Sequence, residues 1–292
     1  MEFRKLTLDC IGTLKPYFTY NECRIYDCSL GGTFMWRDYH NTEYALEDGT
    51  LYLKVTYPEV GFAPPRGKEI SKEPFDRIIE HCIANNEPAR IFFASEKVLE
   101  HILEMFPNAR TQTDRNNSDY LYLSEDLINL SGRRYSGQRN HINHFIREYP
   151  EWSFEQVTGD NLGVVRAFLE ENARENVKDL PIYIEGNKKA LEVLDNLELY
   201  SQFGGMLTVG GEVIGASFGE IVDDTLFIHT EKADTAYPGS YPMLMNQFAK
   251  RFVTGDIEYI NREDDDGDEG LRISKLSYHP SDILDKYTVE IQ

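Results

Sequence analysis

Two cations and a run of acids follow an apolar, strand-like segment near residue 260. The segment 257–260 leads into Asn261 and Arg262, then into the acidic run 263–269, and Lys275 comes shortly after. Loops at strand ends commonly carry binding and catalytic side chains. A cation held there stabilises negative charge that develops on a carbonyl or phosphate oxygen. We therefore expect Asn261 and Arg262 to bind the substrate and the Lys275 ammonium to reach back over the strand toward it.

A second strand-like segment, 225–229, is followed after one residue by Glu231 and Lys232. A carboxylate at the end of a central strand could take a proton from an attacking amine or hydroxyl, which would make Glu231 a general base. The spacing fits an exposed ion pair equally well. The acidic run 263–269 lacks the alternating ligands of an EF-hand loop, so we expect a solvated loop there and predict no metal site.

A basic segment interrupts the acidic chain between residues 133 and 147. It holds four arginines and two histidines without any acid. Because arginines supply paired donors for phosphate or carboxylate groups, we expect a substrate cradle on a helix capped by Ser136. The candidate binding residues of this cradle are Arg134, Arg139, Asn140 and His141. The alternative is a solvated helix face that offsets the acidic surface.

The scaffold that would position these segments shows one order of elements twice. The first half contains a strand at 50–55, a Gly/Pro loop, an amphipathic helix around 75–83 and a strand at 91–93. The second half contains a strand at 225–229, the loop 237–242, a helix around 244–252 and a strand at 257–260. The repeat is one of architecture, because few residues are identical between the halves.

Two helices and a hairpin precede the second unit. The first helix begins near Asn161, and the second spans about 188–199. The hairpin at 206–218 has Gly210 and Gly211 in its turn. Helix, helix, hairpin, strand, loop, helix, strand is the order of the acyl-CoA N-acyltransferase (GNAT-like) fold. We therefore predict an α/β (α+β) protein of two fused GNAT-like domains, 1–136 and 137–292. Each domain is expected to hold a mixed, mostly antiparallel sheet flanked by helices.

The loop before the helix around 244–252 is a candidate anion site lined by Gly239, Ser240 and Tyr241. Free N–H groups at a helix N-terminus favour negative charge. Acetyl-CoA-dependent GNAT enzymes carry Gln/Arg-x-x-Gly-x-Gly/Ala at this point; Gly239 matches that pattern, whereas Ala236 and Tyr241 do not. The sequence favours an ordinary loop-to-helix turn, and acetyl-CoA is the second choice as acyl donor.

The composition is that of an acidic protein with enough apolar residues for real cores. The chain has 292 residues, an apolar fraction of 41% and a formal charge of −20. A field of that sign repels phosphate backbones, which disfavours tRNA as a partner. No apolar run reaches the roughly 20 residues of a membrane span and no signal-peptide pattern is present, so we expect a cytoplasmic protein. The four cysteines are expected to be reduced thiols.

Three stretches resemble the C-terminal domain of phosphatidylglycerol lysyltransferases: 119–124 through the basic segment, 231–241, and 261–278. Members of that family look like two fused GNAT-like domains, similar to the Fem-type aminoacyltransferases of cell-wall synthesis. Characterised relatives move an amino acid from aminoacyl-tRNA to a lipid hydroxyl. The resemblance implies a substrate cleft between the domains, and the residues near it would be Glu231, Lys232, Asn261, Arg262 and Lys275. The membrane-spanning domain of the lipid-modifying enzymes has no counterpart in this sequence, so another acceptor is plausible.

We therefore expect an acyl- or aminoacyl-transferase that moves its group to an amine or a hydroxyl. Glu231 and Lys275 would be its catalytic residues, and aminoacyl-tRNA or acetyl-CoA its possible donor. Two alternatives stay open. An acetyl-CoA-dependent N-acetyltransferase would label an acceptor from acetyl-CoA, whereas a non-catalytic binding protein would show saturable ligand binding without transfer.

Overall fold

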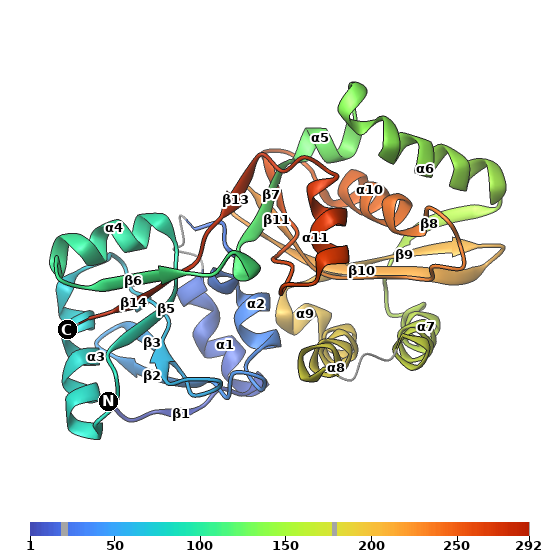
Figure 1. The fold of residues 1–292 in the computed structure, drawn as a ribbon. Coiled ribbons are helices and arrows are strands. Elements are labelled where there is room, and N and C mark those ends of the chain that lie inside the picture. Colours follow the sequence, from blue (N-terminus) through green and yellow to red (C-terminus); the bar gives the residue numbers. More distant parts are fainter. Residues whose placement is uncertain (19–22, 177–179, 292) are drawn as a thin grey trace. The chain divides into compact units, whose positions relative to one another are not determined.

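The computed structural model describes residues 1–18, 23–176 and 180–291. The chain divides into two compact units. Unit 1 comprises Met1–Asp119, Asp264–Gly267 and Ile283–Gln292, and unit 2 comprises Tyr120–Glu263 and Asp268–Asp282. The chain thus returns twice to unit 1 after entering unit 2, and Figure 1 follows this path in colour. Among the described residues no helix is both long and apolar enough to cross a bilayer.

Unit 1 is built on a mixed sheet with the strand order β1-β2-β3-β4-β5-β14-β6. β4 and β5 run parallel, and their neighbours pair antiparallel. The strands are β1 (Arg4–Lys5), β2 (Glu43–Glu47), β3 (Thr50–Val55), β4 (Gly61–Phe62), β5 (Arg90–Ala94), β6 (Arg110–Thr113) and β14 (Tyr287–Glu290). The helices are α1 (Ile11–Leu14), α2 (Leu30–Met35), α3 (Lys72–Asn85) and α4 (Glu96–Met105).

The core of unit 1 forms where the amphipathic helix α3 meets the sheet. Phe75, Ile78 and Cys82 recur at three- and four-residue spacing, which places them on one face of the helix. That face is buried together with Tyr52 and Phe62 of the sheet. Burying side chains of this size stabilises the fold by about 1.5–3 kcal/mol each, so the apolar pattern alone is enough to dock α3.

Unit 2 is built on a second mixed sheet with the order β13-β7-β12-β11-β10-β9-β8. β11 and β12 run parallel, and β12 pairs antiparallel with β7. The strands are β7 (Asp119–Leu123), β8 (Trp152–Gln156), β9 (Phe203–Val209), β10 (Glu212–Val222), β11 (Thr225–Ala233), β12 (Tyr259–Asn261) and β13 (Asp282–Leu284). The helices are α5 (Ser124–Asn129), α6 (Ser136–Glu148), α7 (Leu162–Glu175), α8 (Pro181–Asp195), α9 (Leu197–Tyr200), α10 (Ser240–Phe252) and α11 (Glu269–Leu276).

Helices cover both faces of the unit 2 sheet, with α10 on one face and α7 on the other (Figure 1). Leu244 and Phe248 of α10 are fully buried, as is Val165 of α7. The β9–β10 hairpin turns at Gly210 and Gly211, whose φ angles of 58° and 87° suit glycine. The predicted α/β class, with two mixed sheets flanked by helices, is confirmed.

The two sheets repeat one pattern, and each receives a strand from a distant part of the chain. β5, α4 and β6 follow α3 in unit 1, just as β12, α11 and β13 follow α10 in unit 2. The strand after β6 is β7, which lies between β12 and β13 in the second sheet. The strand after β13 is β14, which lies between β5 and β6 in the first sheet. The repeat of strand, helix and strand that the sequence predicts is therefore completed by two exchanged strands.

Several local expectations differ from the structure. Residues 269–276, to which the sequence assigned no helix, form helix α11, and the helix expected around 188–199 is two helices, α8 and α9. Ser136 is the first residue of α6 and makes no capping hydrogen bond, because Tyr135 occupies the N-cap position. Asn161 does occupy the N-cap position of α7, but its side chain makes no capping bond and instead accepts from Thr158 N in the preceding loop. The boundary at 136/137 between the two repeats stays a prediction.

Candidate functional site

The parallel strands β11 and β12 bring two of the expected site residues to one end of the unit 2 sheet. Phe227 of β11 pairs with Asn261 of β12, so Glu231 and Arg262 both lie toward the carboxyl end of this strand pair. On the other side of β12, Arg262 N donates to Tyr120 O at 3.1 Å and continues the ladder with β7. The backbone around Arg262 is thus held from the neighbouring strand.

Arg262 and Glu231 form a buried ion pair that uses only part of each side chain. Arg262 Nε and Nη2 donate to Glu231 Oε2 at 3.0 and 2.8 Å, and the side chains are 7% and 13% exposed. Within the described ranges, Arg262 Nη1 and Glu231 Oε1 are buried and have no hydrogen-bond partner. A buried polar atom without a partner costs about 1–3 kcal/mol. The pair therefore holds one donor and one acceptor ready for a ligand that supplies the missing partners.

Two tyrosine rings enclose the Arg262 guanidinium. Its carbon lies 4.8 Å from the ring centroid of Tyr278 and 6.0 Å from that of Tyr122, a geometry in which the π face stabilises the cation. Burial raises the pKa of both phenols, although the Arg262 charge opposes this shift. The phenols therefore stay neutral, and the only ionised partner of Arg262 among the described residues is Glu231.

Lys275 does reach back over the strand end, but from a helix and toward the backbone. Asp268 caps α11 by accepting from Leu271 N at 2.9 Å, and Lys275 lies in the last turn with only 6% of its surface exposed. Its Nζ donates to Arg262 O at 2.5 Å. In return Tyr122 Oη donates to Lys275 O at 2.9 Å. Lys275 thus fixes the position of Arg262. The sequence analysis expected both residues at the same site.

His229 forms a second buried charge cluster on the same strand. A β-bulge in β11 leaves His229 unpaired opposite Phe218 and Gly219, which redirects its side chain. Its Nε2 lies 2.9 Å from Glu220 Oε1 and its Nδ1 lies 2.7 Å from Glu263 Oε1. Burial lowers the pKa of His229, but the two glutamates outweigh it and raise the pKa to about 10. The imidazole is therefore a cation at neutral pH and fixes Glu263, the residue after Arg262.

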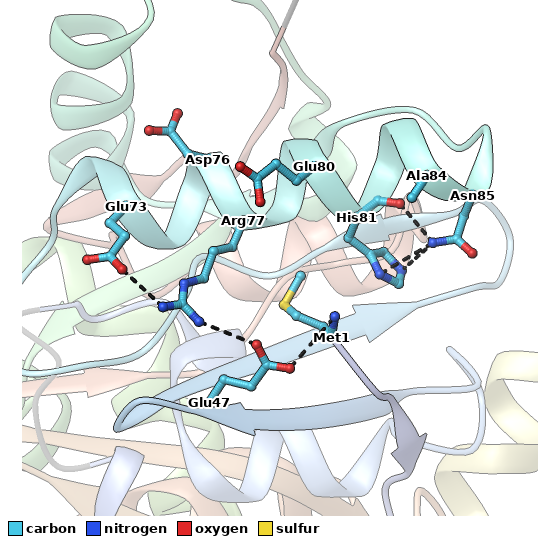
Figure 2. Close-up of a pocket in the computed structure, with 9 residues that line it drawn as sticks. All are labelled: Met1, Glu47, Glu73, Asp76, Arg77, Glu80, His81, Ala84 and Asn85. Carbon is cyan, nitrogen blue, oxygen red and sulfur yellow. Dashed lines mark hydrogen bonds and ion pairs between the residues drawn. The ribbon is translucent and has the colours of Figure 1, made fainter.

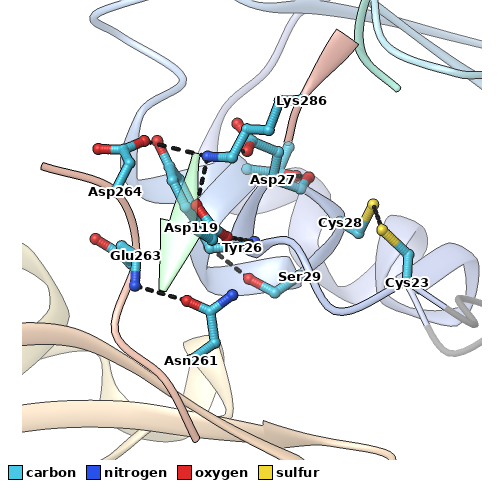
Figure 3. A network of polar contacts seen from close by, with 12 residues as sticks. Cys23, Tyr26, Asp27, Cys28, Ser29, Asp119, Asn261, Glu263, Asp264 and Lys286 are labelled. Atoms are coloured by element: carbon cyan, nitrogen blue, oxygen red, sulfur yellow. Dashed lines mark hydrogen bonds and ion pairs between the residues drawn. The ribbon is translucent and has the colours of Figure 1, made fainter. Parts of the chain in front are cut away.

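The remaining residues of these two stretches are placed as follows. Asn261 is fully buried, and its Oδ1 accepts from Glu263 N at 2.6 Å (Figure 3). This bond closes the turn in which Glu263 has a φ of 58°, so Asn261 shapes the strand end. Lys232 is opposite Ala216 in the β10–β11 ladder, and because strand side chains alternate it points away from the face of Glu231.

The Gly239 loop at the start of α10 is closed by its own contacts. Ser240 N donates to Tyr237 O and Ser240 Oγ donates to Asp234 O. Gly239 has a φ of 93°, and a Cβ there would lie 2.7 Å from His141 O of α6. Tyr241 is 38% exposed. The Ser240 amide and hydroxyl hydrogens are therefore occupied, and glycine is required here for packing against α6.

The residues of the basic segment are not brought to the Glu231–Arg262 pair. Arg134 pairs with Asp126 at 2.8 Å and its side chain is 54% exposed. Arg139 Nη1 donates to the carbonyls of Leu130 and Gly132 at the end of α5. Asn140 and His141 are exposed on α6. The two arginines bind groups of their own unit, which agrees with the alternative reading of a solvated helix face.

A buried lysine cluster in unit 1 has no counterpart among the sequence expectations. Lys286 Nζ lies 2.7 Å from carboxylate oxygens of both Asp27 and Asp119 and 3.1 Å from Asp264 Oδ2 (Figure 3). It also lies 3.7 Å from the ring centroid of Tyr26. Asp264 was expected in a solvated loop, but it is needed here as a partner for a buried cation. No local sequence pattern predicts this cluster, because its members are far apart in the sequence.

A hollow with polar walls lies in unit 1. It has a volume of about 760 Å³ and lies along α3 beside Glu47 (Figure 2). Arg77 occupies its middle and contacts Glu47 and Glu73 at 3.4 and 3.0 Å. The acids that line it are thus partly neutralised by a residue of the same wall. Within the described residues no group of histidines, cysteines or acids is arranged to hold a metal ion.

Comparisons with known proteins identify relatives of the whole chain. A conserved protein of unknown function from Bacteroides thetaiotaomicron has a solved structure that is 29% identical, covers 100% of both chains and gives a TM-score of 0.92. The C-terminal domain of a putative lysylphosphatidylglycerol synthetase from Agrobacterium fabrum is 13% identical, covers 97% of this chain and 92% of that one, and gives 0.70. FemX is 9% identical, covers 100% and 98%, and gives 0.58. The last two show a shared fold, the two fused GNAT-like domains.

Sequence comparison supplies the family. An uncharacterized protein of Mycoplasmoides gallisepticum is 25% identical over 190 residues, which are 60% of this chain and 56% of that relative. The chain thus matches little more than half the length of this curated relative. The family described as phosphatidylglycerol lysyltransferase, C-terminal, matches residues 22–290. Because that match covers nearly the whole chain, the protein belongs to the phosphatidylglycerol lysyltransferase C-terminal family.

Proposed function

We propose that the protein is an acyltransferase of the aminoacyl type whose reaction takes place at the Glu231–Arg262 pair. The observation that carries this proposal is the pair of buried, unpartnered atoms, Arg262 Nη1 and Glu231 Oε1, in the described part of the chain. Nη1 is a donor suited to a carbonyl oxygen, and Oε1 is an acceptor suited to an amine or hydroxyl hydrogen. Acyl transfer brings these two groups together in one transition state.

In the proposed step Glu231 Oε1 accepts a proton and Arg262 Nη1 stabilises an oxyanion. The acceptor nitrogen or oxygen attacks the carbonyl carbon of the donor ester while Glu231 Oε1 takes its hydrogen. Negative charge then develops on the carbonyl oxygen, where Arg262 Nη1 donates to it. The bond from the carbonyl carbon to the donor oxygen breaks, and that oxygen receives the proton from Glu231. Lys275 acts as a positioning residue, because its ammonium holds the Arg262 carbonyl.

The donor is proposed to be an aminoacyl ester and not acetyl-CoA. Family membership supports the aminoacyl group. The closed Gly239 loop also supports it, because Ser240 N and Oγ are bonded within the loop and Pro242 has no amide hydrogen to offer a phosphate. Both atoms of the waiting pair are inaccessible to solvent. The site must therefore open before the substrate enters, and substrate contacts replace the missing hydrogen bonds when it closes.

The test incubates the purified chain with radiolabelled aminoacyl-tRNA and, separately, with labelled acetyl-CoA, and separates any labelled product. We expect transfer from the aminoacyl ester. Arg262→Lys keeps the charge but loses the guanidinium geometry, and it should lower kcat by about 10²–10³ with little change in KM. Glu231→Gln should lower kcat in the same way. Arg174→Lys on α7, an exposed arginine, is the matched control and should keep wild-type turnover.

The two alternatives give other results. If label passes only from acetyl-CoA, the donor is acetyl-CoA and not an aminoacyl ester. Saturable binding of an aminoacyl ester analogue without any transfer, lost in Arg262→Lys, would indicate a binding protein that uses the same pair. Wild-type turnover in both site variants would remove Glu231 and Arg262 from the reaction.

A further inference from the structure

A groove at the edge of the unit 2 sheet combines flat aromatic side chains with cations. It has a volume of about 450 Å³ and lies between β8 and the second half of α10. β8 is the last strand of the sheet, so one side of the groove is not continued by a further strand. The residues that line it are Trp152, Ser153, Phe154, Gln247, Lys250 and Arg251.

Trp152 and Phe154 form the flat part of the groove. They are two residues apart on β8, which puts both side chains on one face of the sheet, and both are only partly buried. A Cβ at Gly205 would lie 2.3 Å from the Phe154 ring, so the ring lies against the glycine backbone of β9. Partly exposed rings of this kind are stacking surfaces for planar ligands such as nucleobases.

Lys250 and Arg251 supply the charge. Both are exposed in the last turn of α10. No residue in the described ranges pairs with Lys250, and Arg251 donates to the neutral amide of Gln156 at 3.0 Å. The helix dipole alone accounts for cations at this helix end, but it does not account for partly exposed aromatic rings beside them. In a chain of formal charge −20, two adjacent cations without an acid partner form a local site for an anion.

We propose that this groove binds a nucleotide, with the base against Trp152 and Phe154 and the phosphate at Lys250 and Arg251. The binding of a free nucleotide and of a single-stranded RNA end would use the same chemistry. The groove takes over the role expected of the basic segment, where Arg134 is already paired with Asp126. This inference does not depend on the proposed acyl transfer, because a nucleotide site can be measured without any turnover.

The chain has two tryptophans, which makes the test direct. In Trp36→Phe the remaining tryptophan, Trp152, lies in the groove, so its fluorescence reports occupancy. AMP and a five-nucleotide single-stranded RNA are titrated separately. Saturable quenching by both supports a site for a free nucleotide, and quenching by the RNA alone supports a strand end. If neither quenches at millimolar concentration, the proposal is wrong.

Charge variants give the second measurement. Lys250→Glu with Arg251→Glu should weaken binding of the quenching probe about tenfold to a hundredfold for each charged contact that is lost. The matched control, Arg174→Glu with Lys188→Glu, changes the net charge equally on α7 and α8 and should retain most of the affinity. Equal weakening by both pairs would show a non-specific field effect and overturn the site. Equilibrium dialysis of labelled probe with the unaltered chain and with Trp152→Ala repeats the test without the Trp36 substitution.

Discussion

The buried carboxylate of Asp119 makes the stability of unit 1 depend on pH in a way that one isosteric substitution removes. Burial, together with the charges of Asp264 and Asp27, raises the pKa of Asp119 from 3.8 to about 7, although Lys286 opposes this shift. The folded protein therefore binds a proton at Asp119 more tightly than the unfolded chain does. As pH rises from 3.8 to 7 this group contributes less stability, and above pH 7 its contribution is constant.

The size of the effect follows from the two pKa values. A difference of about three pKa units corresponds to about 4 kcal/mol. Asp119→Asn keeps the shape of the protonated carboxyl and cannot ionise. Relative to the wild type, the variant should therefore gain about 4 kcal/mol in free energy of unfolding between pH 4 and pH 8. An exposed, salt-bridged aspartate has the opposite effect, because its lowered pKa makes the free energy of unfolding increase as pH rises.

The assay is urea unfolding followed by tryptophan fluorescence at several pH values. Trp152→Phe is the background, so that the signal comes from Trp36, which is in unit 1. Asp9→Asn, at an exposed position, is the control and should leave the pH profile unchanged. If wild type and Asp119→Asn show the same dependence on pH, the Asp119 carboxyl is not held in the environment described here.

Three further outcomes are expected. Lys275→Met should lower the free energy of unfolding by about 1–3 kcal/mol, because the Arg262 carbonyl loses its donor, and should also lower kcat; unchanged kcat at full folding would contradict a positioning role. His229→Gln should lower the free energy of unfolding by up to about 5 kcal/mol below pH 6.5 and by progressively less toward pH 10, because the stabilisation from a raised histidine pKa is lost as pH rises. Denaturant midpoints from pH 6 to pH 10 measure this difference, and a difference that stays constant with pH would contradict it. Gly239→Ala should lower Tm by the equivalent of about 1–3 kcal/mol, because its Cβ would lie 2.7 Å from His141 O at a positive φ; an unchanged Tm in a thermal melt would show that the loop can move.

Elements whose signals are local can be read from the amino-acid order alone. The spacing of Phe75, Ile78 and Cys82 predicts α3, and the Gly210–Gly211 turn predicts the β9–β10 hairpin, because periodicity and turn geometry act over a few residues. The strand end at Asn261 and the family resemblance also singled out Arg262, which is buried and paired with Glu231, while its role in binding or catalysis stays a prediction. These signals were enough for the fold class, which depends on the order of elements.

The partners of the charged residues, in contrast, depend on long-range packing. The exchange of β7 and β14 between the sheets brings Tyr122 beside Arg262 and Lys286 beside Asp27, and no local pattern encodes contacts between residues so far apart in the chain. The same holds for Arg134 and Arg139, which were expected to bind the substrate. In the structure Arg134 pairs with Asp126, and Arg139 donates to a backbone carbonyl. A charge acquires its role from burial and from its partners. Both are set by long-range packing, so the sequence identifies the charged residues but does not predict which partners they bind.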